Sequence, residues 1–235
     1  LHVKILTIIP AYNEEKSITS VISNVRRYIP ESDILVVNDG SSDNTPLYAA
    51  AANAMIINLP FNLGIGGAMQ TGYMFARDNN YDIAVQVDGD GQHNPSDIQK
   101  LVKPVIDNLT DMVIGSRYIS RTSYKSTYLR RIGMVFFSAL VAFLTGNRVR
   151  DTTSGFRVVN RDIINYFAKN YPIDYPEVDV LVKLHKKGFR IMEIPVEMNR
   201  RQCGRSSITP FRSVYYMIKV SISLLIGAIR PADSQ

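Results

Sequence analysis

The first 116 residues alternate between short apolar runs and longer stretches with helical start signals. The apolar runs are nearly continuous, a pattern typical of parallel strands that are covered on both faces. They comprise residues 3–9, 34–38, 54–59, 83–87 and 112–114. Thr45-Pro46 and Asn94-Pro95 each place a capping side chain before a proline, whose missing N–H costs nothing in a first helical turn. The pattern predicts an α/β fold with a doubly wound, mostly parallel central sheet and helices on both faces.

The alternation of strands and helices ends after residue 117. The elements expected there are a basic loop, a long apolar helix over 129–144, a polar turn over 150–157, a helix near 177–187, a strand over 190–198, a basic loop over 200–207 and a last helix opened by Thr209-Pro210. No stretch is rich enough in Gly, Ser or Pro to separate two autonomous units. The sequence therefore predicts a single domain over residues 1–235.

The charge of the chain divides near the same point. Residues 1–110 hold 7 Lys and Arg against 12 Asp and Glu, a net charge of −5, whereas residues 111–235 hold 20 against 9, a net charge of +11. The acidic half indicates recognition of cations, and the basic half indicates phosphate groups of a nucleotide, a lipid or a nucleic acid. Cys203 is the only cysteine, which excludes an intramolecular disulfide and a four-cysteine zinc site and suits a reducing compartment.

Two apolar stretches bear on membrane contact. Residues 132–144 and 214–229 are both shorter than the roughly 20 apolar residues that span a bilayer. Each suits a buried core helix, and each is flanked by arginines that suit a peripheral position on anionic lipid, so both interpretations stay open. The first apolar run ends at Pro10 and is too short for a secretory signal. We therefore expect a cytoplasmic protein, with the inner face of the membrane as its place of peripheral contact.

Polar clusters follow three of the predicted strands, at residues 10–15, 38–43 and 88–93. Because ligands of an open parallel sheet bind beyond the carboxyl ends of its strands, we expect these clusters to share one edge. Asp88 and Asp90, each followed by a glycine, form a loop that can present hard oxygen ligands to Mg²⁺ or Mn²⁺ and leave positions for phosphate oxygens. Such an ion would neutralise charge on a phosphate leaving group.

Other metal and nucleotide motifs fit poorly. An EF-hand requires Gly and Glu at loop positions where this chain has His93 and Gln99, so that interpretation fails, and His93 itself is either a further ligand or a solvated loop residue. The segment 62–69 has Met69 in place of the third glycine of a dinucleotide motif and follows the third strand. No P-loop motif occurs. Gly64 still suits a helix N-terminus that is open to an anion.

Seven short motifs between residues 10 and 207 resemble those of family-two glycosyltransferases with the GT-A fold. They are PAYNE at 10–14, VNDGSSD at 37–43, NLG at 62–64, DGDGQH at 88–93, GSRY at 115–118, SGFR at 154–157 and RQCGRS at 201–206. Within that family the chain is similar to dolichyl-phosphate mannose synthases and bacterial polyprenyl-phosphate glycosyltransferases. The resemblance implies an enzyme that transfers a sugar from a nucleotide-sugar donor.

The resemblance also implies roles for individual residues. The residues that would contact the nucleotide-sugar are Pro10, Tyr12, Glu14, Asp39, Gly64, Asp88, Gly89 and Arg201. Asp39 would accept hydrogen bonds from the base. The metal on the diphosphate would be held by Asp88, Asp90 and Gln92. Arg117 and Arg131 would grip an acceptor phosphate, for which a planar cationic fork is suited.

The family inverts configuration, which calls for a carboxylate base opposite the leaving diphosphate. The candidates are Asp179, Asp151 and Glu177, and alignment of the following helix favours Asp179. Asp151 could instead pair with Arg150 or Arg157, and Glu177 could be a favourable first-turn charge. An acceptor that is already an ionised phosphate needs little base.

The sequence therefore predicts a metal-dependent, inverting glycosyltransferase that uses a UDP- or GDP-sugar and a membrane-associated acceptor. The acceptor is either a polyprenyl phosphate or a sugar hydroxyl of a lipid-linked or surface polysaccharide intermediate, because Ser207 stands where the subgroup has Lys. Residues 1–116 would bind donor and metal, and 117–235, with its amphipathic helices, the acceptor.

Two alternatives to this prediction remain. One is a nucleotidyltransferase that uses a metal-bound nucleotide. The other is a non-catalytic module that binds nucleic acid or polyphosphate. The absence of Trp and of a recognised reader motif disfavours nucleic acid as a partner.

Overall fold

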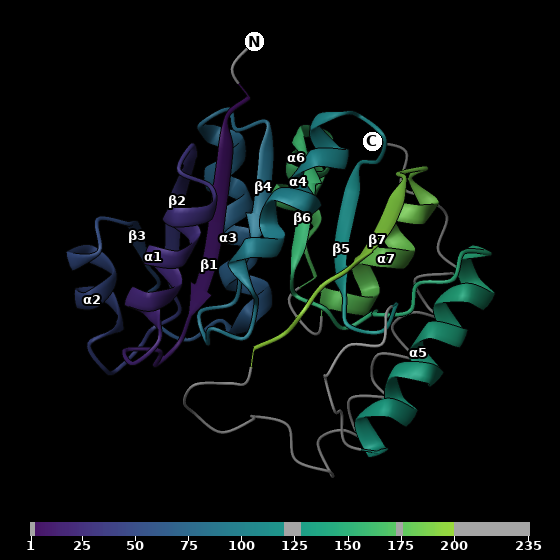
Figure 1. Ribbon diagram of the computed structural model, residues 1–235, viewed down its shortest axis with the longest axis horizontal. Coiled ribbons are helices and arrows are strands. Elements are labelled where there is room, and N and C mark those ends of the chain that lie inside the picture. The colour runs from purple at the N-terminus through teal and green to yellow at the C-terminus, as the bar shows by residue number, and fades with distance from the viewer. Residues whose placement is uncertain (1–2, 120–127, 173–175, 200–235) are drawn as a thin grey trace.

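The computed structural model describes residues 3–119, 128–172 and 176–199, with side chains from 133 onward in the second range. A seven-stranded sheet forms the centre of this part of the chain, in the order β3-β2-β1-β4-β6-β5-β7 (Figure 1). The strands are β1 (Ile5–Ala11), β2 (Ser32–Asn38), β3 (Met55–Asn58), β4 (Ile83–Gln86), β5 (Met112–Ser116), β6 (Arg157–Asn160) and β7 (Ile191–Pro195). The predicted strands are confirmed to within a few residues at their ends.

Helices cover both faces of the sheet, as the sequence predicts. They are α1 (Ile18–Tyr28), α2 (Thr45–Ala51), α3 (Gly64–Asp78), α4 (Ile98–Ile106), α5 (Tyr128–Thr145), α6 (Arg161–Asn170) and α7 (Pro176–Lys186). Helices α1, α2 and α4 bury their apolar side chains on one face, and α3, α5, α6 and α7 on the other. The fold is therefore a doubly wound α/β sheet with two cores, each roughly one layer of helices thick.

Strand β6 runs antiparallel between β4 and β5, whereas the other neighbours in the sheet are parallel. The sequence predicts a polar turn that ends at residue 157, and neither β6 nor α6 is predicted. Strand β6 has only four residues and opens on a charged side chain, so its apolar signal is weak. Asn160 then caps α6 by accepting a hydrogen bond from the N–H of Ile163 at 3.0 Å.

The two predicted helix starts have different outcomes. Asn94 caps as expected, because its side chain accepts from the N–H of Ser96, but it opens a short 3₁₀ turn (Pro95–Asp97) before α4. Thr45 is not a cap, because α2 begins at Thr45 itself. Its hydroxyl instead accepts a hydrogen bond from the N–H of Glu14 at 2.8 Å and so ties two loops together.

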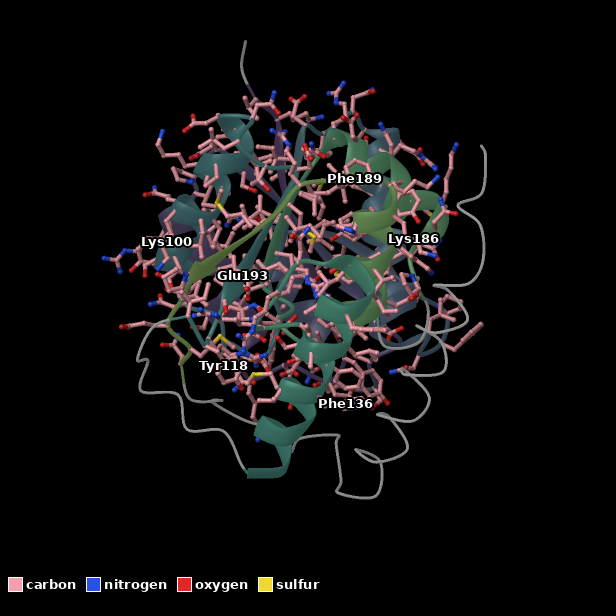
Figure 2. All side chains as sticks on the ribbon, turned by 90° about the vertical axis from the view of Figure 1, so that its right-hand side faces the viewer. Lys100, Tyr118, Phe136, Lys186, Phe189 and Glu193 are labelled. Atoms are coloured by element: carbon pink, nitrogen blue, oxygen red, sulfur yellow. The ribbon has the colours of Figure 1, made fainter. Side chains whose placement is uncertain are left out.

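Helix α5 is apolar on more than one side. Phe137 and Val141 are buried in the core, and the helix packs against α7. Val135, Phe136 and Phe143 are exposed, and Figure 2 shows Phe136 on α5, toward the same end of the molecule as Tyr118. Over the described ranges, no helix is both long and apolar enough to cross a membrane. The predicted loop at 200–207 and last helix lie outside the described residues.

Candidate active site

The three polar clusters meet at one edge of the sheet, as predicted. Strands β2 and β4 both pair in parallel with β1, so their carboxyl ends lie together at the lower edge in Figure 1. The N–H of Asn13 donates to the hydroxyl of Ser41 at 3.0 Å, and the N–H of Ser42 donates to Oδ1 of Asn13 at 2.9 Å. The loops after β1 and β2 therefore hold each other in place.

The loop after β4 packs against the loop after β1. A Cβ at Gly89 would lie 3.1 Å from the carbonyl oxygen of Pro10 and 3.6 Å from Cγ of Glu14. Glycine allows this close approach, whereas a side chain there would press against the backbone of Pro10. Tyr12 lies beside them with half of its surface exposed, which leaves its ring open to a ligand.

Asp39 is buried at the end of β2 and faces the start of α3. Its Oδ1 accepts a hydrogen bond from the N–H of Leu63 at 2.7 Å. Burial raises the pKa of Asp39 above its ordinary value, while hydrogen bonds from the N–H groups of Leu63 and Gly64 act in the opposite direction. Gly64 begins the 15-residue helix α3 with a positive φ of 78°, so the expected helix N-terminus is present.

Asp88 stands two residues beyond β4 and faces the turn before β6. A Cβ at Gly155 would lie 3.0 and 3.1 Å from the two carboxylate oxygens of Asp88. A side chain there would crowd this carboxylate, so glycine leaves it uncovered. Asp90 is buried, and its Oδ1 accepts from the N–H of Gln92 at 3.0 Å.

His93 is neither solvated nor, in this arrangement, placed as a separate ligand. It is 3% exposed and stacks on Phe156, with ring centroids 4.6 Å apart. Its Nδ1 accepts from the N–H of Asp88 at 3.1 Å, and its Nε2 lies 3.5 Å from Oδ2 of the same residue. A neutral ring that accepts at Nδ1 carries its proton on Nε2. The expectation of a solvated loop histidine is therefore wrong, because His93 is buried and contacts Asp88.

The oxygen donors of this loop fit Mg²⁺ or Mn²⁺. Among the described side chains, no group of three or more His, Cys, Asp and Glu residues gathers closely enough to hold a metal ion by itself. Asp88 and Asp90 offer two carboxylates, and Gln92 adds an amide oxygen. Mg²⁺ typically takes one or two carboxylates and fills its other positions with water and substrate phosphate oxygens. The uncovered carboxylate of Asp88 leaves room for such a shared ion.

Arg117 and Asp151, expected in separate roles, form one ion pair. Nε of Arg117 donates to Oδ2 of Asp151 at 2.7 Å, and Nη2 donates to Oδ1 at 2.6 Å. Asp151 has no exposed surface, and Arg117 follows directly on β5 at the carboxyl edge. The predicted partners Arg150 and Arg157 do not take this position.

Glu177 is a candidate base that feels the charges of Arg157, Asp88 and Arg117. Burial raises the pKa of Glu177 above its ordinary value; the charge of Arg157 lowers it, and the more weakly felt charge of Asp88 raises it. Asp179 is also largely buried, but its Oδ2 pairs with Nζ of Lys183 at 2.8 Å on the same helix. Side chains two positions apart on a helix point in different directions, which accounts for the difference.

Arg157 is a buried cation beneath these groups, 1% exposed at the start of β6. Its Nε donates to the carbonyl oxygen of Ser154 at 2.8 Å, and its Nη2 donates to that of Glu177 at 2.6 Å. It therefore joins the turn that faces Asp88 to the first turn of α7. The SGFR motif contains this arginine, but nothing in the sequence shows that it points into the core.

Two expected site residues cannot be placed. Arg201 lies outside the described residues, and the side chain of Arg131 is not described. Glu193 was not predicted as a functional residue, because in the sequence it is simply a charged residue inside a predicted strand. The structure brings its carboxylate to the backbone of Asp151, where the N–H donates to it at 2.8 Å.

Relatives with established names match most of the chain. It is 29% identical to undecaprenyl-phosphate mannosyltransferase of Micrococcus luteus, over 88% of this chain and 88% of that protein. It is 32% identical to UDP-N-acetylglucosamine–dolichyl-phosphate N-acetylglucosaminyltransferase of Methanococcus voltae, over 82% of this chain and 84% of that protein.

Solved structures share the fold. Glucosyl-3-phosphoglycerate synthase from Mycobacterium tuberculosis, in complex with Mn²⁺, UDP and glucosyl-3-phosphoglycerate, superposes with a TM-score of 0.70. The match covers 98% of this chain and 81% of that chain at 21% identity. The same enzyme with Mg²⁺ and UDP gives a TM-score of 0.68 at 20% identity, over 98% of this chain and 81% of that one. The expected GT-A fold is therefore confirmed.

The family model for Glycosyl transferase family 2 matches residues 7–167. This range contains the loops after β1, β2 and β4, Arg117, and the turn that faces Asp88. Family membership favours sugar transfer over the two alternatives, a nucleotidyltransferase and a non-catalytic binding module. The chain belongs to glycosyl transferase family 2.

Proposed function

We propose that the protein is an inverting, metal-dependent glycosyltransferase that moves a sugar from a UDP- or GDP-sugar to a polyprenyl phosphate. One observation carries this proposal. A buried carboxylate at α3 (Asp39), an uncovered carboxylate after β4 (Asp88) and a fixed guanidinium after β5 (Arg117) lie along one edge of the sheet. Asp39 suits recognition of a nucleobase, Asp88 a metal-bound diphosphate and Arg117 an acceptor phosphate. The names of the two relatives support the choice of acceptor.

The chain's own residues would bind and orient the two substrates. Tyr12 offers its exposed ring to the nucleobase and Asp39 its remaining acceptor capacity, while Pro10, Glu14, Gly64 and Gly89 shape the backbone around them. Asp88, Asp90 and Gln92 would hold Mg²⁺ or Mn²⁺, which when bound neutralises the charge of the departing nucleoside diphosphate. Arg117 would hold the acceptor phosphate, with Arg131 and Arg201 as further cationic contacts.

Little proton transfer is needed with this acceptor, because an ionised phosphate oxygen is already a nucleophile. A second candidate function, transfer to a hydroxyl of a lipid-linked or polysaccharide intermediate, is favoured by Glu177. A carboxyl with a raised pKa, close enough to feel the charges of Asp88 and Arg117, suits a general base. We place Glu177 ahead of Asp179 for that role, since Asp179 pairs with Lys183.

A lipid acceptor implies work at a membrane surface. The exposed apolar side chains of α5 and the net charge of +11 in residues 111–235 support peripheral contact with anionic lipid on the cytoplasmic face. Within the proposed single domain, residues 1–116 bind donor and metal, and 117–235 bind the acceptor.

Product analysis tests the proposal. The protein is incubated with Mn²⁺, a short-chain polyprenyl monophosphate, and UDP-glucose, UDP-N-acetylglucosamine or GDP-mannose in turn. We expect one donor to yield a sugar phosphodiester of the lipid with equimolar nucleoside diphosphate, and a β-linked product from an α-linked donor. Release of pyrophosphate, or retention of configuration, would contradict it.

The Glu177→Gln variant separates the two acceptors. With a phosphate acceptor we expect turnover to change less than about threefold, because no proton has to be removed. With a hydroxyl acceptor, loss of a general base lowers turnover by about 100-fold or more. A large loss with polyprenyl phosphate would therefore argue for a different role of Glu177.

A further inference from the structure

A chain of hydrogen bonds leads from the edge strand β7 to Arg117. Glu193 lies on β7, opposite Ile114 of β5, and Arg117 follows β5. Asp151 belongs to the loop between α5 and β6 and stands between the two. Figure 2 shows Glu193 and Tyr118, the neighbour of Arg117, on the face turned toward the viewer. Three segments that are distant in sequence are therefore linked in series, from Glu193 through Asp151 to Arg117.

The link between Asp151 and Arg117 is complete on the carboxylate side. Both oxygens of Asp151 accept from the guanidinium, and Oδ2 also accepts from the backbone N–H of Arg117 at 2.9 Å. Nη2 of Arg117 makes a further hydrogen bond to the hydroxyl of Thr153 at 2.9 Å. A planar fork held at both prongs has a fixed direction, which a single contact would not give it.

Asp151 is placed poorly for a base. A base must touch the proton that it removes, and Asp151 is fully buried with its oxygens engaged by Arg117. Arg117 itself keeps 11% of its side chain exposed at the carboxyl edge. The pair therefore offers the cation, and not the carboxylate, to a ligand.

Glu193 fixes the loop that carries Asp151. Its Oε1 accepts from the N–H of Asp151 and its Oε2 from the N–H of Arg150, both at 2.8 Å. Two consecutive N–H groups on one carboxylate define the orientation of that peptide. The loop has no regular secondary structure at this point, so these bonds replace those that a helix or strand would supply.

We propose that Glu193 and Asp151 are positioning residues that aim Arg117 at the acceptor phosphate, with Glu193 acting through the backbone of Asp151. The inference rests on the proposed function for the contact between Arg117 and the acceptor. Neither carboxylate touches the substrate. Loss of either one lets the guanidinium turn away, so affinity for the phosphate acceptor falls while donor binding stays.

The test uses Glu193→Gln, Asp151→Asn and, as a control, Glu31→Gln. Glutamine keeps the size of Glu193 but turns one acceptor into an NH₂ group that faces a backbone N–H. Glu31 is exposed next to the start of β2, away from the carboxyl edge, and its variant removes the same charge. Glu193→Asp serves as the conservative variant, since it keeps both acceptor oxygens.

Two readouts are measured on the full chain. The first is KM for a short-chain polyprenyl monophosphate, compared with kcat and with the Kd of the nucleoside diphosphate. The second is the exchange rate of the Arg117 Nε–H in ¹⁵N NMR, assigned with Arg117→Lys. We expect Glu193→Gln to raise KM about tenfold, equivalent to about 1.4 kcal/mol, with kcat and Kd within twofold. Nε–H exchange should rise by a similar factor in the same variant and recover in part in Glu193→Asp.

The outcomes separate the possible roles. Unchanged Nε–H exchange in Glu193→Gln would overturn the inference, whatever the enzyme's acceptor is. Loss of kcat at constant KM in Asp151→Asn, with loss of the acidic limb of the pH profile, would make Asp151 the base and also overturn it. If the wild type does not use polyprenyl phosphate, the proposed function fails, and the NMR readout still decides the inference.

Discussion

Replacement of Arg157 by methionine gives the largest effect that we expect from a single residue outside the substrate contacts. Methionine fills much the same space but cannot donate a hydrogen bond. The carbonyl oxygens of Ser154 and Glu177 would lose donors at 2.8 and 2.6 Å, the first in a buried place and the second in a partly buried one. Each hydrogen bond to a charged group contributes about 1.5–3 kcal/mol, so the two together give a loss of about 3–6 kcal/mol.

This loss is a large share of the roughly 5–15 kcal/mol that stabilises a folded domain. Urea unfolding at pH 7, followed by circular dichroism, should show a lower midpoint with an unchanged m-value. Arg157→Lys keeps the charge but not the fork, and we expect about half of the loss. A methionine variant as stable as the wild type would contradict this expectation, since replacement of a buried charge by a packed apolar side chain would then outweigh both lost bonds.

Three further predictions concern the site and its electrostatics. Gly155→Ala should weaken Mn²⁺ binding in the presence of UDP about tenfold by calorimetry, because the new Cβ lies 3.0 Å from a carboxylate oxygen of Asp88. Equal affinity would contradict the expected crowding of this carboxylate. The raised pKa of Glu177 means that the native state keeps its proton longer, so wild-type stability should fall with rising pH between the unfolded and folded pKa values, and the fall should shrink in Glu177→Gln. Hydrogen bonds from Arg190 lower the pKa of Asp111, so their contribution should be lost as pH falls below the ordinary range of Asp, and Asp111→Asn should flatten that acid loss.

Much of the fold was predictable because most of the strands are continuous apolar runs. The runs in β1, β2, β4 and β5 are apolar on both faces, and a strand buried on both faces is easy to recognise. Strand β6 was not predicted because its first residue, Arg157, is charged and was therefore assigned to a polar turn. The buried guanidinium donates to carbonyl oxygens of Ser154 and Glu177, and the sequence does not show that these lie nearby.

The candidate site was predictable at the level of its loops. Strand-end polar clusters identify the carboxyl edge, and the contacts of Asn13 and Gly89 confirm that the loops meet. The partners of individual side chains were not predictable, since they depend on tertiary contacts. His93 lies beneath Asp88 and not in solvent, and Asp151 pairs with Arg117 and not with its sequence neighbours.

In the proposed function, Asp88 and Asp90 hold a divalent ion on the donor diphosphate. The most direct measurement is the Kd of Mn²⁺ in the presence of UDP, by electron paramagnetic resonance of the free ion, for Asp88→Asn, Asp90→Asn and the control Asp107→Asn. Asp107 follows the last residue of α4 and pairs with Lys103 of that helix. We expect at least a tenfold loss of Mn²⁺ affinity in the first two variants and none in the control, whereas wild-type affinity in Asp88→Asn would contradict the account.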